Sequence, residues 1–327
     1  MTDKVYQGCC VAPMARDGGA PMARKGGAVP ALTTRASDAL RADVHALLRP
    51  IPGGFFEMGA RNVRHAPDLD SPPRRVRLSP FRLAETCVTN ALFARFIEES
   101  GYQTTAEAEG WSAVFVSFLD DPDRHPPGPA ATPWWRPVQH ARWDQPEGPG
   151  SSVEGREDHP VVHVSWFDAQ AFCDFTGMRL PTEAEWECAA RGGRKRAKFP
   201  WGNALEPGGK HLHNVWQGRF PIENTLGDGY AGTAPVRSYP ANGYGLYEMT
   251  GNVWDWTDTW FGPLPEASMP PPSDPKGPDQ GPGKVIRGGS HLCQASYCER
   301  YFVHSRTLIT PDSSTGHIGF RPAADAG

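Results

Sequence analysis

The segment from Arg287 to Tyr301 constrains this chain more than any other, because it places Cys293 and Cys298 five residues apart behind a double glycine. Hydroxyl groups, a phenol and arginines flank the two cysteines, and nearby cationic groups favour the thiolate form. Two thiolates, with no third sulfur or imidazole at a fixed spacing, suit a soft ion of low coordination number such as Cu(I) better than tetrahedral zinc.

The spacing alone leaves three interpretations of the cysteine pair open. The two residues could form a structural disulfide or a pair of buried thiols, they could act as a redox pair, or they could hold a metal ion. The residues around the pair have to decide between these interpretations.

Glycine, proline and tryptophan set the expected fold class. The 327 residues include 36 Gly, 34 Pro and 11 Trp, and 39% of them are hydrophobic, which is enough for a core. This mixture predicts a loop-rich α+β fold with little regular secondary structure, held together by aromatic packing rather than by long helices and strands.

Charge and hydropathy argue against several classes of partner. The net charge is −4 and lysine and arginine form no block, so we expect neither nucleic acid nor a membrane surface as a partner. No apolar run reaches the ~18 residues needed to span a bilayer. The first ten residues lack the apolar core of a signal peptide, which predicts a cytoplasmic protein. Seven cysteines in that compartment are expected to be reduced, metal-bound or catalytic.

The chain divides into three predicted parts. Residues 1–35 are small, rich in glycine and proline and without periodicity, which predicts a flexible tail. Residues 36–50 predict a short amphipathic lead-in helix that Ser37 caps and Pro50 stops, packed on the surface of the domain. Residues 51–325 are expected to form the folded domain.

Within that domain, capping patterns predict three helices, which begin after Thr89, Ser165 and Thr182. Alternating residues predict a strand pair at 53–59 and 75–78, and a further strand over 159–166. Residues 120–158 are rich in proline, glycine and charge and predict a long loop on the surface, here called the surface excursion. Residues 133–136 within it are expected to fold back onto the domain. His159, His163 and the glutamates at 183, 185 and 187 are expected to have mainly structural roles.

The cysteine segment resembles the active-site segment of the formylglycine-generating enzymes, the sulfatase-modifying oxidases. The family has a Gly-Gly-Ser-x-x-Cys-x-x-Ser-Tyr-Cys-x-Arg-Tyr run, and the later blocks of its pattern follow in the same order. The matching residues here are Gly288 to Tyr301, Arg306, 310–314 and 319–321. The resemblance spans about residues 51–325 and implies a compact, loop-rich variant of the C-type-lectin fold.

The resemblance also implies a chemistry. Cys293 and Cys298 would hold Cu(I) in an open pocket, and O2 would oxidise the cysteine of a Cys-x-Pro-x-Arg motif in an unfolded sulfatase to Cα-formylglycine. Ser290 and Tyr297 would complete the catalytic set by hydrogen bonding to bound oxygen or sulfur, and Trp254 would form a wall of the cavity. A monomer is expected.

Two oxygen-rich loops could hold Ca²⁺, which takes six to eight oxygen ligands, although such clusters more often only satisfy turns. The resemblance favours structural calcium at both loops. The implied ligands of the first ion are Asn214, Val215, Asp228 and Tyr230, and those of the second are Glu248, Gly251, Val253 and Asp255.

Residues 302–309 depart from the family pattern. Arginine, small residues and an amide are replaced by bulkier or apolar groups, and Gln294 stands where histidine is common. We therefore expect an altered peptide-binding groove. Two alternatives stay open: the same fold acting as an oxidase on another thiol or a metabolite, and a non-catalytic, lectin-like binding module.

Overall fold

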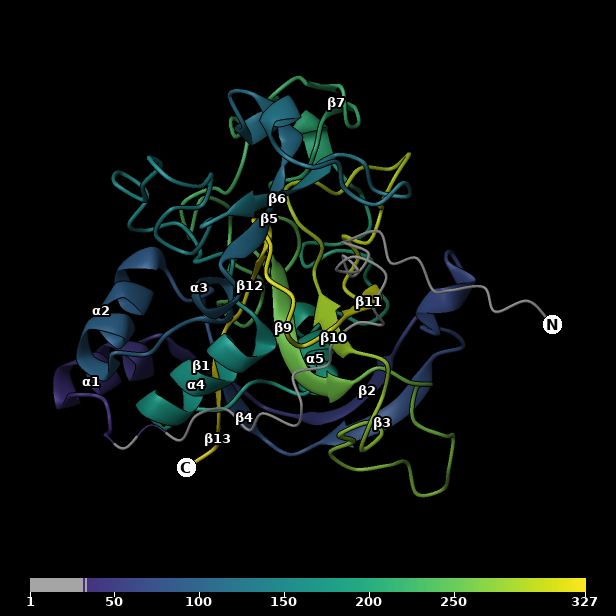
Figure 1. The fold of residues 1–327 in the computed structure, drawn as a ribbon. Coiled ribbons are helices and arrows are strands. Elements are labelled where there is room, and N and C mark those ends of the chain that lie inside the picture. Colours follow the sequence, from purple (N-terminus) through teal and green to yellow (C-terminus); the bar gives the residue numbers. More distant parts are fainter. Residues whose placement is uncertain (1–31, 33) are drawn as a thin grey trace.

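The computed structural model describes Leu32 and residues 34–327, so nearly all of the predicted tail lies outside the described residues. A four-stranded sheet in the order β11-β10-β9-β12 occupies the middle of the molecule (Figure 1). The strands of this sheet are β9 (Trp254–Trp260), β10 (Lys284–Arg287), β11 (Arg306–Ile309) and β12 (Ile318–Gly319). β9, β10 and β11 are antiparallel, and β12 runs parallel to β9.

A three-stranded sheet joins the two ends of the described chain. It consists of β1 (Leu48–Ile51), β4 (Phe81–Ala84) and β13 (Ala323–Asp325) in the order β1-β4-β13. Pro50 is accommodated because β1 is an edge strand, where a missing N–H is tolerated.

The lead-in prediction for residues 36–50 is therefore only partly met. The helix α1 (Asp38–Ala46) does begin after Ser37, whose hydroxyl accepts from the Leu40 backbone N–H. It ends before Pro50, since the chain enters β1 at Leu48. Leu40 and Val44 are fully buried in the largest core cluster, so α1 is part of the core and not an addition to its surface.

Three two-stranded ribbons complete the sheet structure. They are β2 (Gly54–Met58) with β3 (Arg74–Leu78), β5 (Trp111–Phe115) with β6 (Trp135–Gln139), and β7 (Gly218–Arg219) with β8 (Glu223–Asn224). The first ribbon confirms the predicted strand pair. In the predicted excursion, Trp135 folds back into β6 and is buried.

The capping patterns locate the helices correctly. The remaining α-helices are α2 (Asn90–Ser100), α3 (Thr105–Glu109), α4 (Trp166–Thr176) and α5 (Glu183–Ala190). Short 3-10 turns lie at Ala66–Asp68, Val116–Phe118, Pro122–Arg124 and Pro207–Gly209. The strand predicted over 159–166 is wrong, because only an isolated bridge from Pro160 to Thr89 forms and His163 has a φ of 59° that breaks an extended chain.

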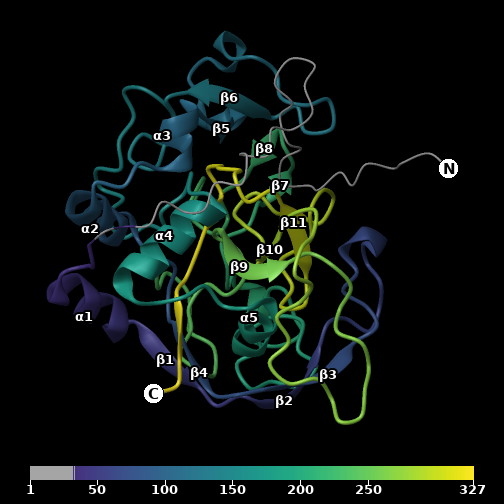
Figure 2. The ribbon, with the colours of Figure 1, turned by 60° about the horizontal axis from the view of Figure 1, so that its bottom comes forward.

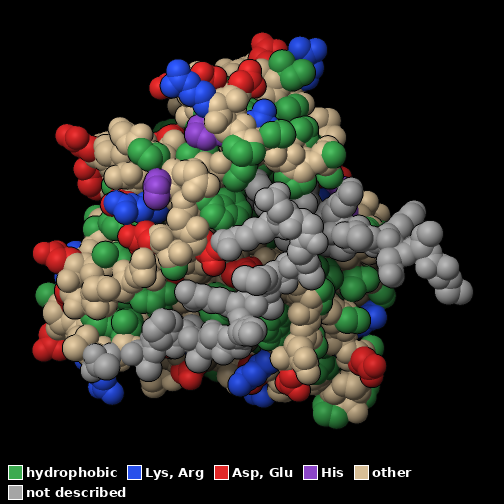
Figure 3. Space-filling model, viewed as in Figure 1, with side chains coloured by type: hydrophobic (Ala, Val, Ile, Leu, Met, Phe, Trp, Pro, Cys, Tyr) green, Lys and Arg blue, Asp and Glu red, His purple; other side chains and the backbone are tan. Residues whose placement is uncertain are grey.

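Aromatic packing holds these elements together, as the tryptophan content predicts. α1, α2 and α4 group on one side of the molecule, where Phe93, Phe96 and Phe172 pack against one another (Figure 2). α5 packs against β9 and β10. No helix in the described part of the chain has the length and apolar character needed to cross a bilayer. On the face seen in Figure 3, acidic and basic side chains are interspersed.

Candidate active site

Both cysteines of the pair lie in the loop that connects β10 to β11. Their Sγ atoms are 3.4 Å apart, which is too far for a disulfide bond. Gln294 and Cys298 exchange two backbone hydrogen bonds, 2.8 and 3.1 Å long, which close the turn between the cysteines. The sequence prediction that these side chains come together is therefore met in the geometry.

The double glycine is needed to place Cys293. Gly288 and Gly289 have φ angles of 92° and 74°, which other residues rarely adopt. A Cβ atom on Gly289 would lie 3.0 Å from the carbonyl oxygen of Arg300 and 3.2 Å from Cys293 Sγ. A side chain at this position would therefore push on the sulfur itself.

Positive charge and an N–H lie next to the sulfurs. Nη1 of Arg300 is 3.9 Å from Cys298 Sγ, and the Ser290 backbone N–H is directed at Cys293 Sγ with a distance of 3.4 Å. Buried Asp68 fixes the arginine through two hydrogen bonds of 2.7 and 2.9 Å. Such surroundings stabilise thiolates. Burial, followed by the neighbouring Cys293, raises the pKa of Tyr301 to about 12, so this phenol stays neutral.

The other two predicted catalytic residues differ in their surroundings. Ser290 is fully buried, and its hydroxyl lies 3.0 Å from Nδ1 of His317 and accepts from the Leu292 backbone N–H. Tyr297 stacks on Phe220, with ring centres 4.3 Å apart and an angle of 2° between the planes.

His317 and Asp68 are site residues that the sequence analysis missed. They are far from the cysteines in the sequence, and no local motif marks them. Trp254, in contrast, is fully buried in the core cluster that also contains both cysteines.

The cysteine pair is more enclosed than predicted. An open pocket was expected, but Cys293 and Cys298 are each only 2% exposed. Ala295 and Ser296, in the turn between them, are exposed. The sulfurs therefore have little contact with solvent, while the turn that joins them is accessible.

Two bulkier residues of the altered segment 302–309 lie in the interior. Phe302 is 5% exposed, lies under the Arg64 guanidinium at 4.4 Å and stacks along His304. Val303 is fully buried in the cluster that contains α5 side chains. Both residues therefore pack inside the protein, and the altered peptide-binding groove stays a prediction.

The first predicted calcium loop presents suitable oxygens. Asn214 Oδ1 is buried and has no hydrogen-bond partner among the residues that the structure describes. The carboxylate of Asp228 lies in the same loop system and accepts from the backbone N–H groups of Val215 and Tyr230 at 3.1 and 3.2 Å. A buried carbonyl-type oxygen without a donor, close to a carboxylate, is what a hard cation would satisfy.

The second predicted loop does not fit calcium in the same way. Both oxygens of Asp255 already take donors, because Oδ1 accepts from Cys87 and Oδ2 accepts from Trp186 and Arg321. Burial raises the pKa of Glu248, whose carboxylate accepts two backbone N–H groups. Among the described residues, no cluster of three or more His, Cys, Asp or Glu side chains could hold a metal ion.

Fold and site together define a class of protein: a loop-rich, C-type-lectin-like α+β domain with a buried pair of cysteines whose sulfurs lie side by side. The solved structure of PvdO from Pseudomonas aeruginosa has the same fold. It aligns with a TM-score of 0.58 and 23% identity over 85% of this chain and 94% of that one.

Residues 38–326 match the family model described as the sulfatase-modifying factor enzyme 1-like domain. The formylglycine-generating enzyme of Thermomonospora curvata is 51% identical over 280 residues, which are 84% of this chain and 92% of that protein. The chain therefore belongs to the formylglycine-generating enzyme (sulfatase-modifying factor) family.

The family also includes proteins named as inactive. The inactive Cα-formylglycine-generating enzyme 2 of Mus musculus is 43% identical over 281 residues, which are 85% of each chain. The activity of this chain therefore has to be argued from its own site.

Proposed function

We propose that this protein is a copper-dependent, O2-consuming oxidase that converts the cysteine of a Cys-x-Pro-x-Arg motif in an unfolded sulfatase to Cα-formylglycine. The observation that supports this most is the buried pair of cysteines, whose sulfurs lie 3.4 Å apart. Two soft thiolate ligands suit Cu(I). The relatives named formylglycine-generating enzymes support the conversion itself.

The surrounding residues have separate parts in this proposal. Cys293 and Cys298 would hold the copper, which supplies one-electron and O2 chemistry that side chains lack. Arg300 and the Ser290 N–H stabilise negative charge on the two sulfurs. His317 fixes the Ser290 hydroxyl through a hydrogen bond of 3.0 Å. Tyr297, with the aromatic rings beside it, offers a flat surface for the peptide next to the pair.

The overall reaction is a two-electron oxidation of the substrate cysteine. Its Cβ and sulfur each lose one hydrogen, and the resulting thioaldehyde takes up water to give the aldehyde and hydrogen sulfide. O2 accepts these two electrons, and an added thiol reductant supplies two more, so that O2 ends as water. The protein has to hold the substrate thiol within reach of the pair and keep bulk water away.

The test uses the full chain, loaded with Cu(I) and incubated aerobically with a thiol reductant and a peptide that contains Leu-Cys-Thr-Pro-Ser-Arg. Mass spectrometry should show the thiol side chain replaced by an aldehyde. Cys293→Ser and Cys298→Ser should each abolish turnover, while Cys188→Ala, at a buried thiol outside the site, should retain it.

The outcomes separate the alternatives. Copper binding without peptide turnover would favour oxidation of another thiol or a metabolite. Neither copper binding nor turnover would favour a binding module. Full turnover by either serine variant would refute the two-thiolate site.

We also propose one structural Ca²⁺, at the loop that contains Asn214 and Asp228. This site has the oxygen without a partner, whereas Asp255 at the second loop is already engaged. Calcium should raise the melting temperature of the protein, because a ligand that binds only the folded state stabilises it. Asp228→Asn should remove most of that rise, while Asp121→Asn, at an exposed carboxylate, should keep it. A rise that Asp228→Asn leaves unchanged would contradict this assignment.

A further inference from the structure

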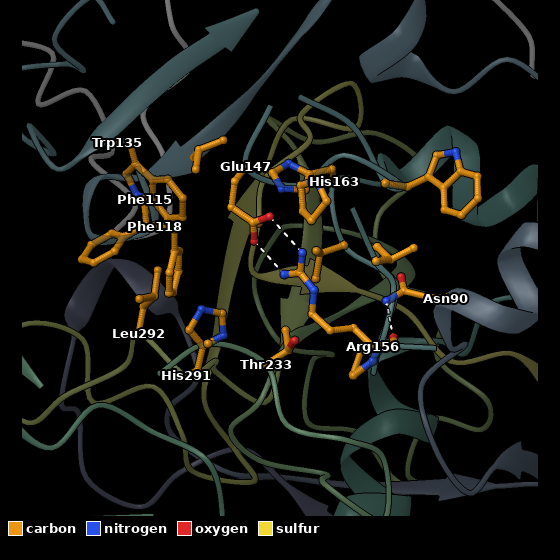
Figure 4. Close-up of a pocket in the computed structure, with 18 residues that line it drawn as sticks. Asn90, Phe115, Phe118, Trp135, Glu147, Arg156, His163, Thr233, His291 and Leu292 are labelled. Atoms are coloured by element: carbon orange, nitrogen blue, oxygen red, sulfur yellow. Dashed lines mark hydrogen bonds and ion pairs between the residues drawn. The ribbon is translucent and has the colours of Figure 1, made fainter. Parts of the chain in front are cut away.

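A cavity of about 180 Å³ lies beside the active-site loop, and no function has been assigned to it so far (Figure 4). Neither cysteine lines it, but His291 and Leu292, which directly precede Cys293, form part of its wall. An apolar cavity of ~150 Å³ is large enough to bind benzene. The volume therefore accommodates one aromatic ring with a small substituent.

One side of the cavity is apolar and largely aromatic. Phe115, Phe118, Trp135 and Leu292 lie together on the left of Figure 4, and Val114 also lines the space. Aromatic faces favour a flat ring packed against them in an offset or edge-on arrangement. Water gains little on such a wall, because apolar cavity surfaces tend to stay dry.

In contrast to the apolar wall, His291 contributes a polar group to the cavity, a hydrogen-bond acceptor that no other group in the described part of the chain uses. Its Nδ1 lies 2.9 Å from the carbonyl oxygen of Asn252, so Nδ1 carries the proton and donates. In a neutral ring that donates from Nδ1, Nε2 is a lone-pair acceptor, and it is buried without a partner among the described residues. Figure 4 shows the ring facing the cavity.

The charged groups at the cavity do not call for a charged ligand. Arg156 and Glu147 pair with each other through two hydrogen bonds of 2.7 and 2.9 Å. Burial lowers the pKa of His163 to about 4, so this imidazole is also neutral. A carboxylate or an ammonium group would enter the cavity without a free counter-charge and would bear the cost of desolvation.

Three more lining residues carry buried polar atoms without a hydrogen-bond partner. These atoms are an acceptor, Asn90 Oδ1, and two donors, the indole Nε1 atoms of Trp135 and Trp143. A hydroxyl group both donates and accepts. From volume, wall and charge together, we infer that this cavity is a binding site for a small neutral hydroxylated aromatic molecule, of the phenol class, whose hydroxyl donates to His291 Nε2.

The inference is tested by titrating the full chain with phenol at pH 7.5 in a calorimeter, without copper. Toluene serves as a probe of matched size without a donor, and benzoate as a charged probe. A hydrogen bond to the buried acceptor should make phenol bind about tenfold more tightly than toluene. Benzoate should bind least.

Two variants locate the binding. Gly232 lines the cavity with an ordinary backbone conformation, and a Cβ atom there would meet only the Phe118 ring, at 3.4 Å. Gly232→Leu should therefore fill the space and abolish phenol binding. Glu98→Leu places the same side chain at an exposed position of α2 and should change nothing. His291→Phe should remove the preference for phenol over toluene.

Two results would overturn the inference. The absence of saturable phenol binding by the unmodified chain would mean that solvent alone fills the cavity. Equal phenol binding by Gly232→Leu would place the ligand elsewhere. If His291→Phe fails to fold, the Gly232→Leu result decides the question.

Discussion

At the scale of single residues, the position of Cys293 Sγ depends on the absence of a side chain at Gly289. Gly289→Ala should weaken Cu(I) binding by roughly 10- to 100-fold, as changes next to metal ligands do. The new methyl group would lie 3.2 Å from the sulfur and 3.0 Å from a carbonyl oxygen. It should also cost about 1–2 kcal/mol of stability, because alanine is strained at a φ of 74°. Competition with a Cu(I) chelator measures the affinity.

Gly155→Ala is the matched control for this backbone effect. Gly155 has the same φ of 74°, but nothing lies within 4 Å of its Cβ position. In urea unfolding, Gly155→Ala should lose only the stability that its φ angle costs and Gly289→Ala at least as much, and only Gly289→Ala should lose copper affinity. If the two variants bind copper equally, the glycine has no role in placing the sulfur.

The sequence predicts the residues of the proposed copper site but not the distant residues that contact them. Cys293, Cys298 and Ser290 form one short segment, so a linear motif reveals them. His317 and Asp68 reach the site through the fold, and their contacts depend on tertiary packing. The burial of the sulfurs also escaped prediction, because burial depends on how the whole chain packs and not on a local motif.

At the scale of elements, α5 supports the strand that leads into the cysteine loop. Glu187 of α5 accepts from Arg287 at the end of β10 at 2.5 Å and from Arg191 at 2.6 Å, and it is fully buried. Burial alone would raise its pKa, but the two arginines outweigh this effect and hold it at about 2. α5 and β10 are therefore joined by a buried ion pair, and separating it would cost free energy.

Glu187→Gln should cost about 3–5 kcal/mol of unfolding free energy, because it removes the buried carboxylate that pairs with Arg191 and with Arg287, which keeps its longer 3.5 Å pair with Glu183. Glu57→Gln is the exposed counterpart. Glu57 pairs with Arg61 and Arg196 at the surface, where a salt bridge contributes about 0–1 kcal/mol. Urea unfolding at pH 7.5 compares the two variants. If both lose the same unfolding free energy, the buried ion pair contributes no more to stability than the exposed one.

Helices were easier to predict than strands for a physical reason. A capping box such as Ser165 with Asp168 is local, and both of its hydrogen bonds form within four residues. The segment 159–166 alternates like a strand, but no partner strand pairs along it and His163 turns the backbone. Pairing partners are set by the whole fold, so the alternation alone misled the assignment.

At the scale of the whole molecule, neutral histidines are built into separate parts of the interior. Burial lowers the pKa of His163 and His291 to about 4 and that of His213 to about 3. His163 contacts Ser112, and His213 packs in an aromatic cluster with Trp201 and Tyr301. In the unfolded chain all three would titrate near pH 6.5.

These histidines should make the protein sensitive to acid well above the range in which carboxylates titrate. Below pH 6.5 these histidines take up protons in the unfolded chain, whereas in the folded chain they stay neutral until about pH 4. Their contribution to stability is therefore fully present above pH 6.5 and is lost as the pH falls. Three such groups give a slope of up to about 4 kcal/mol per pH unit within this window. His213→Phe should lower the slope by about one proton, whereas His45→Gln, at an exposed position of α1, should leave it unchanged. Urea unfolding between pH 5 and 7.5 measures the slope, and a flat profile for the unmodified chain would show that the buried imidazoles are protonated in the folded state.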